Sequence, residues 1–224
     1  MRNAVAFLCF GLTLALVLAA CTQDAYEKGE GLYSLLRADF VEAHSNSEKQ
    51  IDYVTTDDDV KLQLDELVGY SWVKTADSLY RAIYYYNLLD DGRAKVVSAG
   101  RVGIPSVVLK DSLKQPVKMD PLRIESLWVG KNKRYLNACI YLKTGATDNK
   151  EAAHQLAIVA DTIVKHANGK RTVWMRLYHD QGGMPEYYSQ RTYFSLPLYG
   201  LKVDSLQLTI RTYDGDYQRV FPLK

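Results

Sequence analysis

Cys21 is the residue of this sequence with the clearest chemistry, because it ends a motif for covalent lipid attachment. Residues 4–20 are mostly apolar, follow a single positive charge at Arg2, and lead into the lipobox Leu18-Ala19-Ala20-Cys21. The apolar stretch is shorter than the roughly 20 residues of a spanning helix, and a cleavage site follows it directly, as in a signal peptide. Cleavage would free the thiol for diacylglycerol and the new amino group for an acyl chain such as palmitate. Because several acyl chains make a durable anchor, we expect a lipoprotein of a bacterial outer membrane that starts at Cys21.

His179-Asp180, together with Glu186, is the best local candidate for acid–base chemistry. The pair ends a strand-like segment, and Gly182-Gly183 separates it from Glu186. A His-Asp pair at a strand end is typical of a turn in which the carboxylate caps backbone amides. No helix follows the two glycines, so we interpret them as a flexible loop and not as a phosphate cradle.

Other catalytic signatures are missing from the sequence. The four histidines lack metal-pair spacing such as H-x-x-x-H, and neither a G-x-S-x-G elbow nor a P-loop occurs. Glu42 and Glu125 are equally well explained as residues on solvated strand faces. We therefore expect no enzyme, no catalytic residue and no cofactor. The alternative is an envelope hydrolase or an accessory subunit of one.

Two further groups receive structural interpretations. Cys139 lies in the strand-like run 135–143 with no His or carboxylate close in sequence, which predicts a buried thiol that packs as a small hydrophobe. The acidic run Asp57-Asp58-Asp59 lacks the alternating ligands, the glycine and the distal Glu of a calcium loop. We expect it to be a solvated turn, and we expect no metal site.

Charge argues against one class of partner. The chain has 28 Lys and Arg against 26 Asp and Glu, a net charge of +2, which becomes +1 when the signal peptide takes Arg2 away. Basic and acidic residues are interleaved, whereas a nucleic-acid binder normally carries a basic stripe. Nucleic acid is therefore excluded as the expected partner.

The elements that must position these residues are strands. From Leu32 onward, short runs of Val, Ile, Tyr, Leu and Thr alternate with Gly, Asp, Asn and Pro, and no helical stripe of a dozen residues occurs. This pattern predicts an all-β protein. After the signal peptide (1–20) and a polar tether (21–31), we expect a small closed barrel of five or six strands over 32–118. An antiparallel β-sandwich of six or seven strands should occupy 119–224.

Two local expectations refine this division. The stretch 109–121 is poor in strand-forming residues and contains Pro116 and Pro121, which predicts a linker with the domain boundary near Met119. One helical turn is expected near 65–68.

Turn signals locate three hairpins. Asp91-Gly92 should join 79–90 to 95–101, and Asn168-Gly169 should join 155–165 to 171–179, both through two-residue type I′ turns. A three-residue loop, Asp214-Gly215-Asp216, should join 205–212 to 217–221, because it places Ile210 opposite Val220.

The Asn168-Gly169 hairpin also predicts a candidate binding surface. A two-residue turn pairs Ala160 with Leu177, Thr162 with Met175 and Val164 with Val173 on a core face. The opposite face then carries Trp174, Arg176 and Tyr178 as a ladder, with Asp161 opposite Arg176 as an ion pair. The ladder either covers a sheet face as part of the fold or presents an aromatic platform to a sugar ring or a protein partner.

The sequence resembles the NigD-like lipoproteins of Bacteroidetes, in which a lipobox and an acidic tether precede an OB-fold domain and a C-terminal β-sandwich. The resemblance lies in short stretches spread over nearly the whole mature chain: Tyr80-Arg81-Ala82-Ile83-Tyr84-Tyr85-Tyr86-Asn87, Tyr135-Leu136-Asn137, Tyr141-Leu142-Lys143, Leu177-Tyr178-His179-Asp180 with Gly183, and Ser195-Leu196-Pro197-Leu198. None of these is a catalytic signature. The resemblance implies an OB-like barrel and a membrane location, and with them a non-enzymatic binding or assembly module for an envelope protein or a glycan. The acids of the tether are scattered here, whereas surface-exported relatives tend to cluster them behind the cysteine.

Four tripeptides resemble the Asp-Ser/Thr-apolar motif that Bacteroidetes use for O-glycans on exported proteins. They begin at Asp77, Asp111, Asp161 and Asp204. Ser112 is the expected acceptor because it lies in the predicted linker, whereas Thr162 is expected to point inward from a strand.

Overall fold

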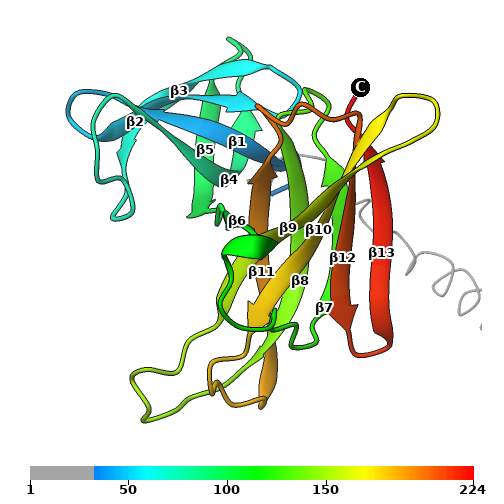
Figure 1. Ribbon diagram of the computed structural model, residues 1–224. Coiled ribbons are helices and arrows are strands. Elements are labelled where there is room, and N and C mark those ends of the chain that lie inside the picture. The colour runs from blue at the N-terminus through cyan, green and yellow to red at the C-terminus, as the bar shows by residue number, and fades with distance from the viewer. Residues whose placement is uncertain (1–32) are drawn as a thin grey trace, which may run out of the picture. The chain divides into compact units, whose positions relative to one another are not determined.

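The computed structural model describes residues 33–224, of which Arg37–Lys224 form one compact unit (Figure 1). The predicted signal peptide, Cys21 and the tether 21–31 lie outside the described residues. No helix within 33–224 has the length and apolar character needed to span a membrane. The described elements are β1 (Arg37–Ser45), β2 (Gln50–Thr56), β3 (Lys61–Gly69), β4 (Ser78–Leu88), β5 (Ala94–Arg101), β6 (Ser106–Leu109), η1 (Lys110–Ser112), β7 (Arg123–Val129), β8 (Tyr135–Thr144), β9 (Gln155–Lys165), β10 (Arg171–Asp180), β11 (Tyr188–Pro197), β12 (Ser205–Thr212) and β13 (Gly215–Pro222).

The first five strands close into a barrel in the order β1-β2-β3-β5-β4, which confirms the predicted small barrel. Alternate side chains along each strand point inward and form an apolar core that includes Val41, Ile51 and Tyr84. The helical turn expected at 65–68 is wrong, because these residues belong to β3. A register shift between β2 and β3 at Ile51–Tyr53 breaks the regular alternation that would have marked this strand in the sequence.

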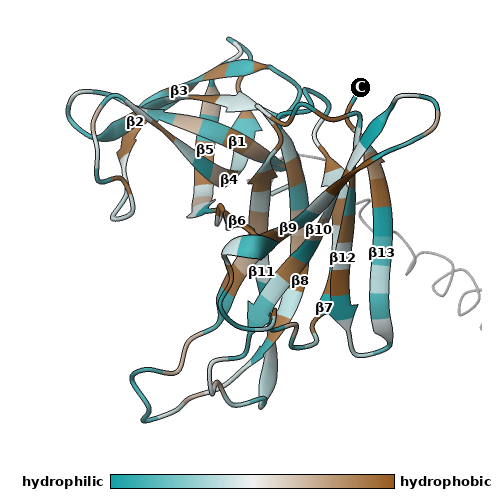
Figure 2. Ribbon diagram, viewed as in Figure 1, coloured by the Kyte–Doolittle hydropathy of each residue, from teal (hydrophilic) through white to brown (hydrophobic). Residues whose placement is uncertain are grey.

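The remaining strands form a β-sandwich, as expected. One sheet has the order β13-β12-β10-β9-β6, the other has the order β11-β8-β7, and apolar side chains from both fill the space between them. Bands of hydrophobic and hydrophilic residues alternate along the strands in Figure 2. Residues 119–224 hold seven strands of the sandwich, β7–β13, within the expected six or seven, and β6 from before that range adds an eighth. The sandwich is not purely antiparallel, because β10 pairs with β12 and β6 pairs with β9 in parallel.

The end of the barrel lies earlier in the chain than the expected boundary near Met119. Its last strand ends at Arg101, and β6, only a few residues later, pairs with β9 of the sandwich. The four residues of β6, Ser-Val-Val-Leu, would suit a strand of either domain, so the sequence pattern could not show which sheet they join. Part of the predicted linker also contains η1.

All three hairpins join the predicted strands, but their turns differ from the predictions. In the β4–β5 and β9–β10 hairpins only the glycines, Gly92 and Gly169, have positive φ, whereas a type I′ turn needs two such residues. The His166 amide donates to the Lys170 carbonyl, which makes the β9–β10 loop longer than predicted.

The longer loop and a bulge change the register of β9 against β10. Val173 faces Ile163, and after the bulge between Trp174 and Met175, Met175 faces Ala160. The predicted pairs are therefore wrong, although the face assignment along β10 holds. In the β12–β13 hairpin Ile210 faces Tyr217 and not Val220, because the strands resume pairing at Thr212 and Gly215.

A buried polar network joins the barrel to the sandwich within the compact unit. Arg81 of β4, 4% exposed, donates from Nη2 to Asp57 Oδ2 (2.7 Å) and to Asn137 Oδ1 (2.9 Å), and from Nε to Ser195 Oγ (3.0 Å). Asn137 Nδ2 donates to the same Asp57 oxygen (2.7 Å), and the Arg81 guanidinium lies 4.0 Å from the centroid of the Tyr135 ring. The network thus pairs every charge that it buries.

The acidic run is part of this contact and is not simply a solvated turn. Asp58 forms an ion pair with Lys131, and Asp59 Oδ1 accepts from Asn132 Nδ2 (3.1 Å). Three of the stretches that carry the family resemblance contribute Arg81, Asn137 and Ser195 to the network. Their residues therefore hold the two β domains together.

Candidate functional site

The ladder of Trp174, Arg176 and Tyr178 lies on the outer face of the five-stranded sheet, as predicted. Val173, Met175 and Leu177, which alternate with them along β10, are buried between the two sheets. Trp174 is 42% exposed, whereas Arg176 and Tyr178 are half-buried. The exposed part of the ladder is therefore concentrated at Trp174.

Arg176 is occupied by an ion pair. Its Nε donates to Asp161 Oδ2 at 2.8 Å, and Nη2 contacts the second oxygen of the same carboxylate. This confirms the predicted ion pair, although Asp161 reaches it from the bulge of β9 and not from a regular register position. The hydrogen bonds to Asp161 raise the pKa of Arg176. We interpret Arg176 as a structural residue that links β10 to β9 beside Trp174 through its ion pair with Asp161.

Trp174 forms one wall of a hollow of about 370 Å³ on this face. Trp174 faces Thr162 on one side and Gln207 on the other, and Gln207 in turn faces Val220 of β13. The loop between β9 and β10, yellow in Figure 1, lies at the end of these strands. The lining residues are His166, Asn168, Lys170, Thr172, Trp174, Ser205, Gln207 and Val220.

Thr172 and Ser205 form the polar floor of this hollow. Their hydroxyl oxygens lie 2.7 Å apart, and His166 Nε2 lies 2.7 Å from Thr172 Oγ1. Asn168 Oδ1 accepts from the Lys170 amide (3.0 Å), which leaves the amino group of the Asn168 side chain as a donor. The hollow therefore combines one apolar platform with several groups that donate or accept hydrogen bonds.

His179-Asp180 has a structural role. Asp180 Oδ1 accepts from the Gly182 amide at 3.0 Å, and Asp180 Oδ2 accepts from Lys118 Nζ at 2.7 Å. These contacts hold the pKa of Asp180 below its usual value. The predicted capping turn is therefore present. The described contacts do not bring Glu186 to His179, whose ring is buried and bonded to other groups.

A second histidine contacts His179, which sequence spacing did not indicate. His179 Nδ1 donates to the Asp120 carbonyl (2.9 Å), and its Nε2 lies 3.0 Å from His154 Nδ1, so the two rings share a hydrogen bond. The second ring nitrogen of His154, Nε2, is buried. Burial, and then the neighbouring His179, lower the pKa of His154 from its ordinary 6.5.

This pair predicts an acid-sensitive fold. A histidine whose pKa is lowered by folding stabilises the protein fully above pH 6.5 and loses that contribution as the pH falls below it. We expect the free energy of unfolding in urea to fall between pH 7.5 and pH 5.5, and to fall less in His154→Gln, whose amide can donate to His179 but does not titrate. An equal fall in both proteins would contradict the assignment.

Cys139 is buried, as predicted, but it has charged neighbours that are distant in sequence. Its thiol donates to Glu125 Oε2 (2.8 Å), and Arg191 Nε donates to the sulfur (3.2 Å). Burial, and then Glu125, raise the pKa of the Cys139 thiol, while Arg191 holds the pKa of Glu125 below its usual value. A thiol with a raised pKa is a poor nucleophile.

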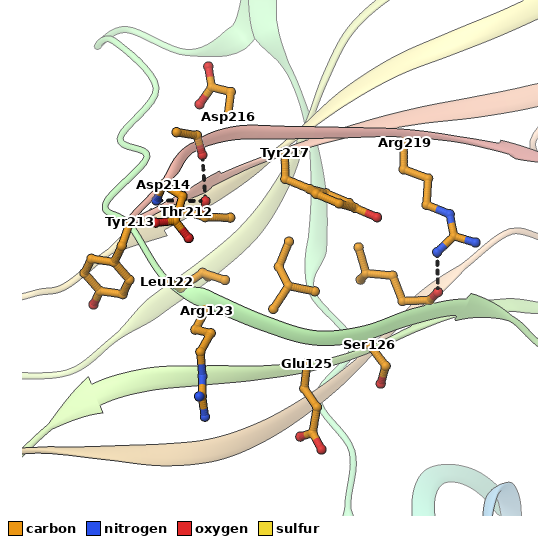
Figure 3. A pocket seen from close by; sticks show the side chains of 13 residues that line it. Leu122, Arg123, Glu125, Ser126, Thr212, Tyr213, Asp214, Asp216, Tyr217 and Arg219 are labelled. Carbon is orange, nitrogen blue, oxygen red and sulfur yellow. Dashed lines mark hydrogen bonds between the residues drawn. The ribbon is translucent and has the colours of Figure 1, made fainter.

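A pocket of about 630 Å³ between β7 and the β12–β13 hairpin bears on the hydrolase alternative (Figure 3). Two of its three carboxylates, Glu125 and Asp216, point to opposite sides in the view, and the third, Asp214, lies beside Thr212 in the turn of the hairpin. Glu125 pairs with Arg191, and Asp216 pairs with Arg211 at 2.9 Å. The hydrogen bond from Arg191 lowers the pKa of Glu125, whereas a general acid needs a raised pKa. This pocket suits charge pairing better than proton transfer.

Ser112, the proposed glycan acceptor, ends η1 and is exposed, and its Oγ donates to the Leu109 carbonyl (2.6 Å). Thr162, expected to point inward, is exposed opposite Trp174, because the bulge in β9 reverses its face.

The fold and the site define an all-β protein in which a closed barrel packs on a two-sheet sandwich with an exposed aromatic surface. The family model of the NigD-like C-terminal beta sandwich domain matches residues 105–222, more than half of the chain. The chain belongs to the NigD-like family. A comparison with curated proteins gave no match.

Solved structures share this fold. A NigD-like immunity protein from Bacteroides caccae superimposes with a TM-score of 0.64 at 23% identity, covering 82% of this chain and 91% of its own. A protein of unknown function from Bacteroides vulgatus gives a TM-score of 0.64 at 13% identity, covering 84% and 90%. At these identities the similarity concerns the fold alone, and neither description names an enzyme.

Proposed function

We propose that this protein is a non-enzymatic, lipid-anchored binding module of the outer membrane that engages a glycan or an envelope protein through the outer face of its five-stranded sheet. The observation that carries the proposal is the position of Trp174, which is 42% exposed at the wall of a hollow that is also lined by polar side chains. An indole provides a large, rigid contact area at low entropic cost and is common at binding surfaces. The lipobox at Cys21 supplies the membrane attachment.

Trp174→Ala tests the binding surface. We expect capture of the native partner from envelope extracts by the full-length protein to weaken by about tenfold or more. The melting temperature should change by a few degrees at most, because Trp174 lies on the outer face of the sheet and outside the apolar core. Tyr187→Ala is the control, since Tyr187 is 78% exposed outside this hollow. A melting temperature lowered by several degrees with capture intact would assign Trp174 to the fold.

Cys21→Ser tests the anchor. We expect this variant to lose lipidation and to appear in the soluble fraction, because serine has no thiol to accept diacylglycerol. Metabolic labelling with a fatty acid and membrane fractionation measure the two effects. A variant that fractionates with membranes as fully as the parent would show that Cys21 is not the anchor.

A further inference from the structure

We infer that the hollow beside Trp174 binds an anionic sugar, one that bears a carboxylate or a sulfate. The inference rests on the proposed binding function and names the chemistry of its ligand. It depends on the shape of the hollow and on the charges of the residues that line it.

The hollow offers contacts for the two kinds of surface that a sugar presents, its C–H groups and its hydroxyl groups. One face of a pyranose presents C–H groups, which pack on an aromatic ring such as Trp174. The hydroxyl groups around the ring both donate and accept hydrogen bonds, and the hollow offers the amide groups of Asn168 and Gln207 and the hydroxyl of Ser205.

The charge of the hollow selects among sugars. Lys170 lines it and forms no ion pair with any residue from 33 to 224, and the lining contains no Asp or Glu. The two nearby acids are occupied elsewhere: Asp161 pairs with Arg176, and Asp204 pairs with Lys224 and accepts from the Arg171 amide. An unpaired ammonium in a site without carboxylates favours an anionic ligand.

The experiment compares matched charged and neutral probes. Calorimetric titrations of the detergent-solubilised full-length protein would use a galacturonate tetramer against its methyl ester, and a sulfated galactose tetramer against its desulfated form. We expect at least one charged probe to bind about tenfold more tightly than its neutral partner, and which one does so distinguishes carboxylate from sulfate. Added salt should weaken that preference.

Variants separate the two halves of the site. Trp174→Ala should abolish binding of charged and neutral probes alike, whereas Lys170→Gln should keep the neutral affinity and remove the preference for charge. Lys131→Gln is the control, because Lys131 is exposed and pairs with Asp58, outside the hollow.

Two results would overturn the inference and leave the proposed function standing. Equal binding of charged and neutral probes would make the surface a neutral-glycan site. Absence of binding to all four probes, with Trp174-dependent capture of an envelope protein, would make the partner a protein. The proposed function itself fails if Trp174→Ala captures its envelope partner as well as the parent does.

Discussion

Arg81→Met is expected to lower the free energy of unfolding by about 3–5 kcal/mol, because it leaves a buried carboxylate without its positive partner. The side chain of Arg81 is 1% exposed and that of Asp57 is 14% exposed, so water cannot replace the lost guanidinium. Methionine keeps most of the chain length, which limits the effect of a cavity. Urea unfolding at neutral pH, followed by circular dichroism, measures the change.

Two further variants define what this loss means. Arg93→Met removes a second arginine–aspartate ion pair, in which the side chains of Arg93 and Asp91 are both about half exposed. We expect its cost to be a small fraction of that of Arg81→Met, because water solvates the remaining carboxylate. Adding Asp57→Asn to Arg81→Met should restore part of the loss, because the unpaired charge is then gone. A cost for Arg81→Met as small as that of Arg93→Met would show that the network does not stabilise the contact between barrel and sandwich.

Gly182→Ala is expected to have the second largest effect, on the order of 3 kcal/mol of the free energy of unfolding. Gly182 has φ +59°, and an added Cβ would lie 2.0 Å from the carbonyl oxygen of Ala153. That oxygen belongs to the backbone and cannot move without displacing the segment that carries His154. The same urea titration measures the loss.

Gly183→Ala is the matched control for this glycine. Gly183 also has positive φ, +74°, but an added Cβ would meet nothing closer than Asn149 Nδ2 at 3.9 Å. Gly183→Ala should therefore lower the free energy of unfolding only by the cost of the strained backbone, about 1 kcal/mol. If the two alanine variants are equally stable, the close approach to Ala153 does not limit the loop. The two glycines, interpreted from the sequence as a flexible loop, thus have different roles that only their surroundings distinguish.

The sequence by itself determined the fold class, the strands of all three hairpins and the face of β10 that carries Trp174, Arg176 and Tyr178. These features depend on residues close together in the chain. Alternation of apolar and polar residues places side chains on one face or the other, and glycine marks the turns. The buried state of Cys139 and the capping role of Asp180 follow from the same local patterns.

The tertiary structure alone decided the features that join distant segments. A single bulge in β9 changed the register beyond Trp174 and exposed Thr162, because one inserted residue reverses the face of every residue after it. The Arg81 network, the His154–His179 pair and the hollow beside Trp174 each bring together residues from several strands or loops. Nothing in the spacing of these residues predicts their contact, because strand pairing and sheet packing, not sequence separation, set the distances between them.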